Sequence, residues 1–102
     1  MRFEWDDQKN DANIRLHKID FADVPTVFNG PLLTDLDERI EYGEERWISI
    51  GLLYDLTVVV VWTEREHDTI RIISTRKANK DERQRYEAYL TNRLGPFSSD
   101  DG

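Results

Sequence analysis

The spacing of apolar residues at the start of the chain predicts a strand followed by a helix. Phe3–Trp5 is a short aromatic segment that fits a first strand. An apolar stripe at helical spacing follows, made of Trp5, Ala12, Leu16 and Ile19. This stripe predicts a helix over about residues 6–18, with Asp6 as its N-cap and with His17 off the stripe.

A second, shorter helix is predicted over about residues 22–28, and beyond it the pattern changes to strands. Pro25 fits the first turn of this helix, which favours Asp23 over Asp20 as its cap. Apolar and β-branched residues then predict strands at about 32–36, 46–53, 56–62 and 69–75. The third of these reads LTVVVVW, which is typical of a strand buried on both faces.

The last element is predicted to be a helix that begins near Asn79. Asn79 can cap it, and Glu82 lies three residues on, as in a capping box. Its apolar stripe consists of Tyr86, Tyr89, Leu90 and Leu94. Gly95-Pro96 is expected to end the helix, so we predict a folded domain over 1–94 and a polar tail over 95–102.

These elements in the order β-α-α-β-β-β-β-α predict one α+β domain. Short links between consecutive strands favour an antiparallel sheet, and the helices are expected to pack on one of its faces. A chain of 102 residues leaves no room for a second domain. No apolar stretch is long enough to span a membrane, no signal peptide is visible and no cysteine is present, so we expect a cytoplasmic protein.

The charge distribution qualifies what the net charge of −7 implies. An acidic protein is a poor ligand for nucleic acid, because phosphate contacts need basic surface. Residues 64–93, however, hold eight Lys and Arg against six Asp and Glu, whereas residues 1–63 are strongly acidic. The back of the chain is therefore the place to look for nucleic-acid contacts, and the acidic front could attract a basic protein partner.

Several stretches, taken in order, resemble the BrnT toxin family. They are Phe3-Glu4-Trp5-Asp6, Asn13 with His17, Phe21-Ala22-Asp23, Val27-Phe28, Gly43-Glu44-Glu45-Arg46, 59–65, 70–78, Glu82-Arg83 and Tyr86. The resemblance covers about residues 3–90 and implies a RelE-like fold, with about four antiparallel strands, two N-terminal helices and one C-terminal helix. Family members usually carry glycine after the histidine, whereas this chain has Lys18, which is disfavoured in a left-handed helix cap.

The resemblance implies a ribonuclease toxin that cuts RNA without a metal or cofactor and inhibits translation and growth. It also implies a BrnA-like antitoxin with a ribbon-helix-helix domain, a toxin–antitoxin heterotetramer, and contact with DNA only through the antitoxin. Zinc-ligand spacing is absent from the sequence. The alternative is a catalytically inactive module that binds the antitoxin in transcriptional autoregulation, and a third interpretation is a sheet-based scaffold without a toxin role.

Cleavage by the 2′-hydroxyl of RNA needs a base, an acid and cations around the phosphate. The predicted catalytic residues are His17, Glu64, Arg65 and Arg76, and the predicted RNA-binding residues are Lys18, Arg71, Lys77, Lys80 and Arg83. Arg76 is the first choice, because arginine can clamp a phosphate with two hydrogen bonds.

Each candidate also has a purely structural interpretation. Arg76 could be a surface residue at a strand end, and Glu64 could pair with Arg71. His17 could complete a helix dipole, and the basic residues near 80 could be a solvated helix face. Antiparallel pairing places Glu64 and Arg65 at the opposite end of the hairpin from Arg76, so one continuous site is not guaranteed.

Overall fold

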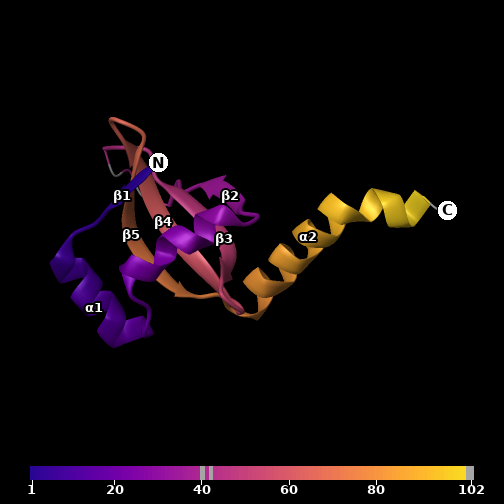
Figure 1. The fold of residues 1–102 in the computed structure, drawn as a ribbon, viewed down its shortest axis with the longest axis horizontal. Helices are drawn as coiled ribbons and strands as arrows, with labels where there is room; N and C mark the ends of the chain where they lie inside the picture. The colour runs from indigo at the N-terminus through magenta and orange to yellow at the C-terminus, as the bar shows by residue number, and fades with distance from the viewer. Residues whose placement is uncertain (40, 42, 101–102) are drawn as a thin grey trace.

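The computed structural model describes residues 1–39, 41 and 43–100, and its elements follow the predicted order (Figure 1). They are β1 (Arg2–Glu4), α1 (Asp7–His17), η1 (Phe21–Asn29), β2 (Leu33–Leu36), β3 (Trp47–Leu53), β4 (Leu56–Arg65), β5 (Thr69–Lys77) and α2 (Lys80–Asp100). The second predicted helix, η1, is a 3-10 helix, and Asp20 rather than Asp23 caps it by accepting from the amide of Ala22 at 2.9 Å.

The sheet has five strands in the order β1-β5-β4-β3-β2, and it is mixed. The β1 strand runs parallel to β5, with Phe3 opposite Ile70, while the other neighbours are antiparallel. The expected RelE-like sheet of about four antiparallel strands is therefore wrong in the number of its strands and in the direction of one. A strand of three residues carries no local sign of its partner, and the chain through α1 and η1 is long enough to cross over into a parallel pair.

Helices cover both faces of the sheet, so the prediction that they share one face is wrong. On one face, η1 packs its buried Phe21, Val24 and Val27 against Val58 and Val60 of β4. On the other, the buried Tyr86 of α2 packs against Val59 of β4 and Ile50 of β3. The predicted double burial of β4 is confirmed, and this is the physical reason why both faces need a cover.

Gly51 of β3 lets η1 lie close to the sheet. A Cβ atom at this position would sit 2.7 Å from Cγ1 of Val27 and 2.8 Å from Cδ2 of Leu32, which is too close. The absence of a side chain therefore sets how closely η1 approaches β3.

The α1 helix buries a polar residue instead of its apolar stripe. Leu16, predicted to face the core, is 75% exposed, while Asn13 is only 5% exposed. The Asn13 side chain accepts a hydrogen bond from the amide of Thr75 at 3.2 Å and donates one to the carbonyl of Ile19 at 3.0 Å. Because β1 pairs with β5 only over residues 69–71, the rest of that edge needs another cover, and α1 supplies it.

The α2 helix begins as predicted and ends later than predicted. The amide of Asn79 donates to Glu82 and the amide of Glu82 donates to Asn79, both at 2.8 Å, which confirms the capping box. The helix continues through Gly95-Pro96 to Asp100 and projects away from the sheet (Figure 1). Glycine lowers helix propensity and proline removes one backbone donor, but neither forbids helical dihedral angles. Residues 101–102 of the predicted tail lie outside the described residues.

Candidate functional site

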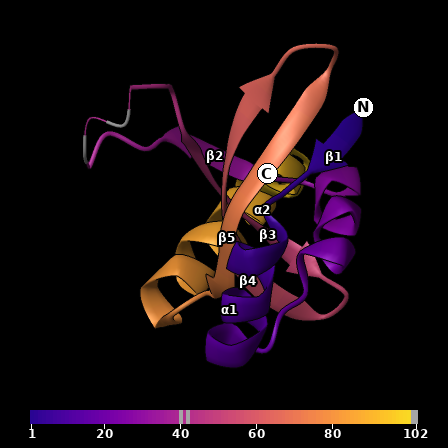
Figure 2. The same ribbon diagram turned by 90° about the vertical axis from the view of Figure 1, so that its left-hand side faces the viewer.

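The predicted site residues separate into two groups at opposite ends of β5. Arg65 lies opposite Thr69 at the β4–β5 turn, whereas Arg76 lies opposite Val59 near the other end of the strand. Glu64 and Arg71 accompany Arg65 at the first end, which we call the hairpin end. The predicted basic residues Lys77, Lys80 and Arg83 lie at the second, where β5 leads into α2 and which we call the helix end (Figures 1 and 2).

At the hairpin end, the predicted charged residues are engaged in ion pairs with other partners. Arg71 pairs with Glu4 at 2.9 Å, because β1 lies beside β5 and puts these two residues in register. The alternative pairing of Arg71 with Glu64 is therefore wrong. Arg65 pairs with Glu44 at 3.4 Å. An open hollow of about 600 Å³ lies here, lined by Arg2, Glu4, Glu64, Arg65, Glu66, His67 and Thr69.

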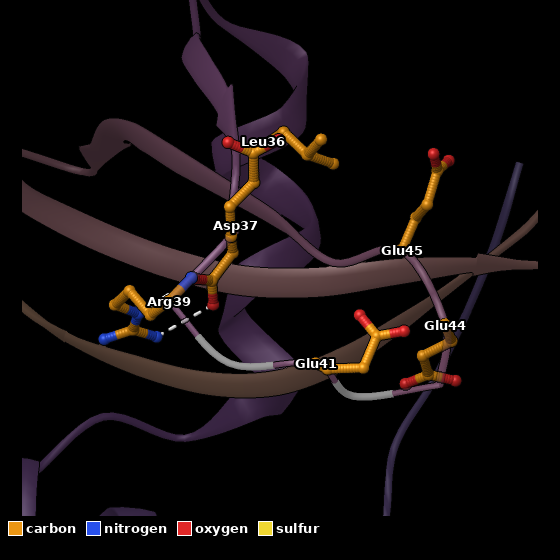
Figure 3. A pocket seen from close by; sticks show the side chains of 7 residues that line it. Leu36, Asp37, Arg39, Glu41, Glu44 and Glu45 are labelled. Carbon is orange, nitrogen blue, oxygen red and sulfur yellow. Dashed lines mark hydrogen bonds and ion pairs between the residues drawn. The ribbon is translucent and has the colours of Figure 1, made fainter.

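The loop after β2 forms an acidic hollow of about 400 Å³ (Figure 3). Its lining residues are Leu36, Asp37, Glu38, Arg39, Glu41, Glu44 and Glu45. Asp37 is buried and is held by Arg39 through two hydrogen bonds of 2.8 Å, which Figure 3 shows in part. Five carboxylates around one hollow repel phosphate, so this region is an unfavourable surface for RNA.

At the helix end, a groove of about 220 Å³ lies between β2, β3, β5 and the start of α2, and we call it the arginine groove. Its lining residues are Leu33, Asp35, Arg39, Ile48, Ile50, Arg76, Glu82 and Arg85. The three guanidinium groups come from three separate segments of the chain. This groove combines an apolar lining from β2 and β3 with clustered arginines, which suits contact with a phosphate backbone.

Arg76 is held in the groove by Glu82. Its Nη1 and Nη2 atoms each donate to one carboxylate oxygen of Glu82 at 2.8 Å, and Nη1 also donates to the carbonyl of Lys77 at 3.3 Å. The hydrogen bond to Glu82 raises the pKa of Arg76, although burial and the nearby charge of Arg39 lower it. The same hydrogen bond from Arg76 lowers the pKa of Glu82 to about 2, against the opposing effect of its burial. Glu82 is therefore ionised at neutral pH and is a weak base.

The other two arginines of the groove also have carboxylate partners. Arg85 of α2 reaches Asp35 of β2 at 3.4 Å and links the helix to the edge strand. Arg39 is bound to Asp37, and its charge is felt at Arg76. The groove is thus positively charged only in part, because each guanidinium lies beside a carboxylate.

The predicted residues at the end of α1 lie along the outer edge of β5 and do not line the arginine groove. The α1 helix runs in the same direction as β5 (Figures 1 and 2), and Asn13 is bonded to Thr75. Four helical residues advance about 6 Å and two strand residues about 6.6 Å, so His17 lies about level with Lys77. Lys18 adopts the left-handed conformation expected of glycine, with φ 61° and ψ 30°, and its Nζ donates to the carbonyl of Arg15 at 3.1 Å.

Around the helix end, the predicted basic residues stay accessible. Lys77 and Lys80 are exposed, and Arg83 donates to the carbonyl of Ala78 at 3.4 Å. The expected Arg83–Glu87 pair is not formed among the described residues. Together with Arg76, these residues place four cations at one end of the sheet.

Sequence reasoning missed part of the groove. Glu82 was expected to cap a helix but not to hold Arg76, although a capping box two residues after a strand places its carboxylate near that strand's end. No local signal pointed to Arg39, Arg85 or Asp35, because they meet only when β2 and α2 pack together. No group of three or more potential metal ligands is present in the part of the chain that the structure describes. None of its helices is long and apolar enough to cross a membrane.

Comparison with known proteins assigns this chain to the ribonuclease toxins of type II toxin–antitoxin systems. Residues 5–82 match the family described as "Ribonuclease toxin, BrnT, of type II toxin-antitoxin system", and the chain belongs to the BrnT family. The crystal structure of the ribonuclease toxin BrnT of Brucella abortus is similar, with a TM-score of 0.62 and 24% sequence identity over 78% of this chain and 99% of that one. This likeness supports the shared fold. Comparison with curated proteins finds no match.

Proposed function

We propose that this protein is a metal-independent endoribonuclease toxin that contacts its RNA at the arginine groove. The observation that carries this proposal is the convergence of Arg39, Arg76 and Arg85 on one groove in a member of a ribonuclease toxin family. Cleavage of cellular RNA would inhibit translation and growth. A BrnA-like ribbon-helix-helix antitoxin would neutralise the toxin in the cytoplasm.

The chemistry requires no group that the chain lacks. The 2′-hydroxyl of a ribose attacks the adjacent phosphorus, the bond to the 5′-oxygen breaks, and a cyclic phosphate is left. Negative charge develops on the phosphate oxygens in the transition state, and a guanidinium that donates two hydrogen bonds stabilises it there. We assign this role to Arg76.

For proton transfer we retain His17, Glu64 and Arg65 as the remaining proposed catalytic residues. His17 is the only one of the three that lies at the helix end, about level with Lys77, and histidine titrates near neutral pH. Glu64 and Arg65 lie at the hairpin end, so RNA contacting them and Arg76 together would have to span the length of β5. Alanine variants of each, assayed for cleavage, separate one extended site from two unrelated ones.

Lys77, Lys80 and Arg83 would track the RNA backbone away from Arg76, with Lys18 and Arg71 as further proposed contacts. Each phosphate contact adds about 0.7 to the slope of log affinity against log salt for a single strand. Alanine at Lys77 or Lys80 should therefore weaken RNA binding and reduce that slope. A slope that does not change would remove the residue from the interface.

The test of the activity is expression without the antitoxin together with cleavage by the purified protein in a metal chelator. We expect growth arrest and RNA cleavage that Arg76→Ala reduces by about 100-fold, the effect typical of removing one transition-state donor. Arg15→Ala is the matched control, because Arg15 is an exposed arginine on α1 far from the groove. Growth arrest that persists in Arg76→Ala would exclude the assigned role.

We propose that the antitoxin forms a heterotetramer with the toxin, with a dimer of the antitoxin at its centre. DNA would then be contacted only through the ribbon-helix-helix domain of the antitoxin. Light scattering of the co-expressed complex gives the stoichiometry. A complex with one toxin for each antitoxin dimer would contradict the heterotetramer.

The second candidate function is an inactive module that binds the antitoxin in transcriptional autoregulation. It is favoured by the net charge of −7 and by the carboxylate beside each groove arginine. Purified protein that binds its antitoxin tightly but leaves RNA intact over a range of pH and salt would support this function instead.

A further inference from the structure

Arg76 keeps one edge of its guanidinium group free even though Glu82 holds it. Glu82 accepts from Nη1 and Nη2, which is the end-on fork of the side chain, and the carbonyl of Lys77 takes the other Nη1 hydrogen. The Nε hydrogen and the second Nη2 hydrogen have no hydrogen-bond partner among the described residues. These two hydrogens point to the same side of the planar group and form a second fork that matches two oxygens of a phosphate.

Glu82 is itself fixed by the start of α2. One of its oxygens accepts from the amide of Asn79 at 2.8 Å, and its own amide donates to the Asn79 side chain at 2.8 Å. The link between β5 and α2 is tied to the sheet, because the amide of Ala78 donates to the carbonyl of Thr57 at 2.9 Å. Glu82 therefore has little freedom to move, and its side chain is only 17% exposed.

We propose that Glu82 is a positioning residue that presets Arg76 so that its free Nε–Nη2 edge binds a phosphate of the RNA. This inference rests on the proposed function and assigns to Glu82 a role beyond capping the helix. Arginine has four side-chain torsions, and holding it in one conformation before RNA arrives removes the entropy loss from the binding step. The end-on pair with Glu82 does this without occupying the edge that faces no protein partner.

The charge of Glu82 makes the proposal testable, because positioning and electrostatics predict opposite results. A carboxylate near a phosphate is repulsive, so an electrostatic effect alone would make Glu82→Gln bind RNA more tightly and cleave it at least as fast. If Glu82 positions Arg76, the same change lowers kcat. Glutamine can still accept from the amide of Asn79, so the capping box is retained.

The experiment measures kcat and KM for an RNA oligonucleotide with the wild type, Glu82→Gln, Arg76→Ala and the double variant. Asp81→Asn is the matched control, because Asp81 is an exposed carboxylate in the same helical turn. We expect Glu82→Gln to lower kcat by about 10- to 100-fold with a smaller change in KM. In the Arg76→Ala background it should change kcat by less than about twofold, because Glu82 acts through Arg76.

A 2′-O-methyl oligonucleotide, which lacks the attacking hydroxyl, keeps this inference separate from the proposed activity. If the wild type does not cleave RNA, the proposed ribonuclease activity fails, and binding of this probe decides the role of Glu82. Weaker binding by Glu82→Gln supports positioning, and equal or tighter binding overturns it. Where the wild type does cleave, wild-type kcat in Glu82→Gln, or an equal loss in the Arg76→Ala background, overturns the proposal.

Discussion

Replacing Asn13 by alanine tests whether α1 is held on the sheet by a polar clamp. The side chain of Asn13 is buried, and it serves the amide of Thr75 and the carbonyl of Ile19 at once. Alanine would leave both backbone groups buried without a partner, at about 1–3 kcal/mol for each. The higher helix propensity of alanine returns about 0.6 kcal/mol. We therefore expect the free energy of unfolding to fall by about 3 kcal/mol.

Urea unfolding followed by tryptophan fluorescence measures this change, and a domain of this size should lose roughly 15 °C in Tm. Asp11→Ala is the control, because Asp11 is exposed on the same helix and makes the same gain in helix propensity. Amide hydrogen exchange gives a local readout, since the amide of Thr75 should exchange faster in Asn13→Ala. A loss of less than about 1 kcal/mol, or an unchanged exchange rate at Thr75, would refute the clamp.

Three further predictions concern the helix ends and the groove. Lys18→Gly should raise the free energy of unfolding by about 0.5–1 kcal/mol, because glycine adopts the left-handed conformation freely and only the exposed bond to the carbonyl of Arg15 is lost; a lower Tm would contradict this. Tyr86→Phe should cost about 1 kcal/mol in urea unfolding, since it removes the 2.8 Å bond from the buried ring to the carbonyl of Pro31, and no change would show that this bond is dispensable. The folded-state pKa of Glu82 is about 2, below its usual value of 4.5, so its contribution to stability is present above about pH 4.5 and is lost as the pH falls towards 2. The shift alone would correspond to about 3 kcal/mol, but Arg76 is 42% exposed and solvent screening leaves about 1–2 kcal/mol; unfolding curves of the wild type and Glu82→Gln should converge at low pH, and a constant difference would be the contrary result.

The separation of the charged residues has a consequence for how the protein would meet RNA. The acidic hollow and the hairpin end carry most of the paired carboxylates, while the helix end carries Arg76 and the exposed lysines. A phosphate backbone is therefore repelled from one end of the sheet and attracted to the other. The net charge of the whole chain hides this difference, and for that reason it is a poor guide to nucleic-acid binding here.

The sequence by itself determined the order of the elements, the double burial of β4 and the capping box of α2. These features depend on residues close together in the chain, where apolar periodicity and turn chemistry report local backbone preferences. The left-handed conformation of Lys18 belongs to the same group, because the position just after a helix favours it whatever residue is present. The resemblance to the BrnT family was also present in the local motifs, and the family match confirms it.

Only the tertiary structure decided how these elements meet. The parallel pairing of β1, the burial of Asn13 in place of Leu16, and the meeting of Arg39, Arg76 and Arg85 were not predicted. Each depends on partners distant in the sequence, as with Asn13 and Thr75, whose positions differ by 62. The physical reason is that a strand edge or a charged side chain takes the partner that packing brings to it, and local sequence does not encode that partner.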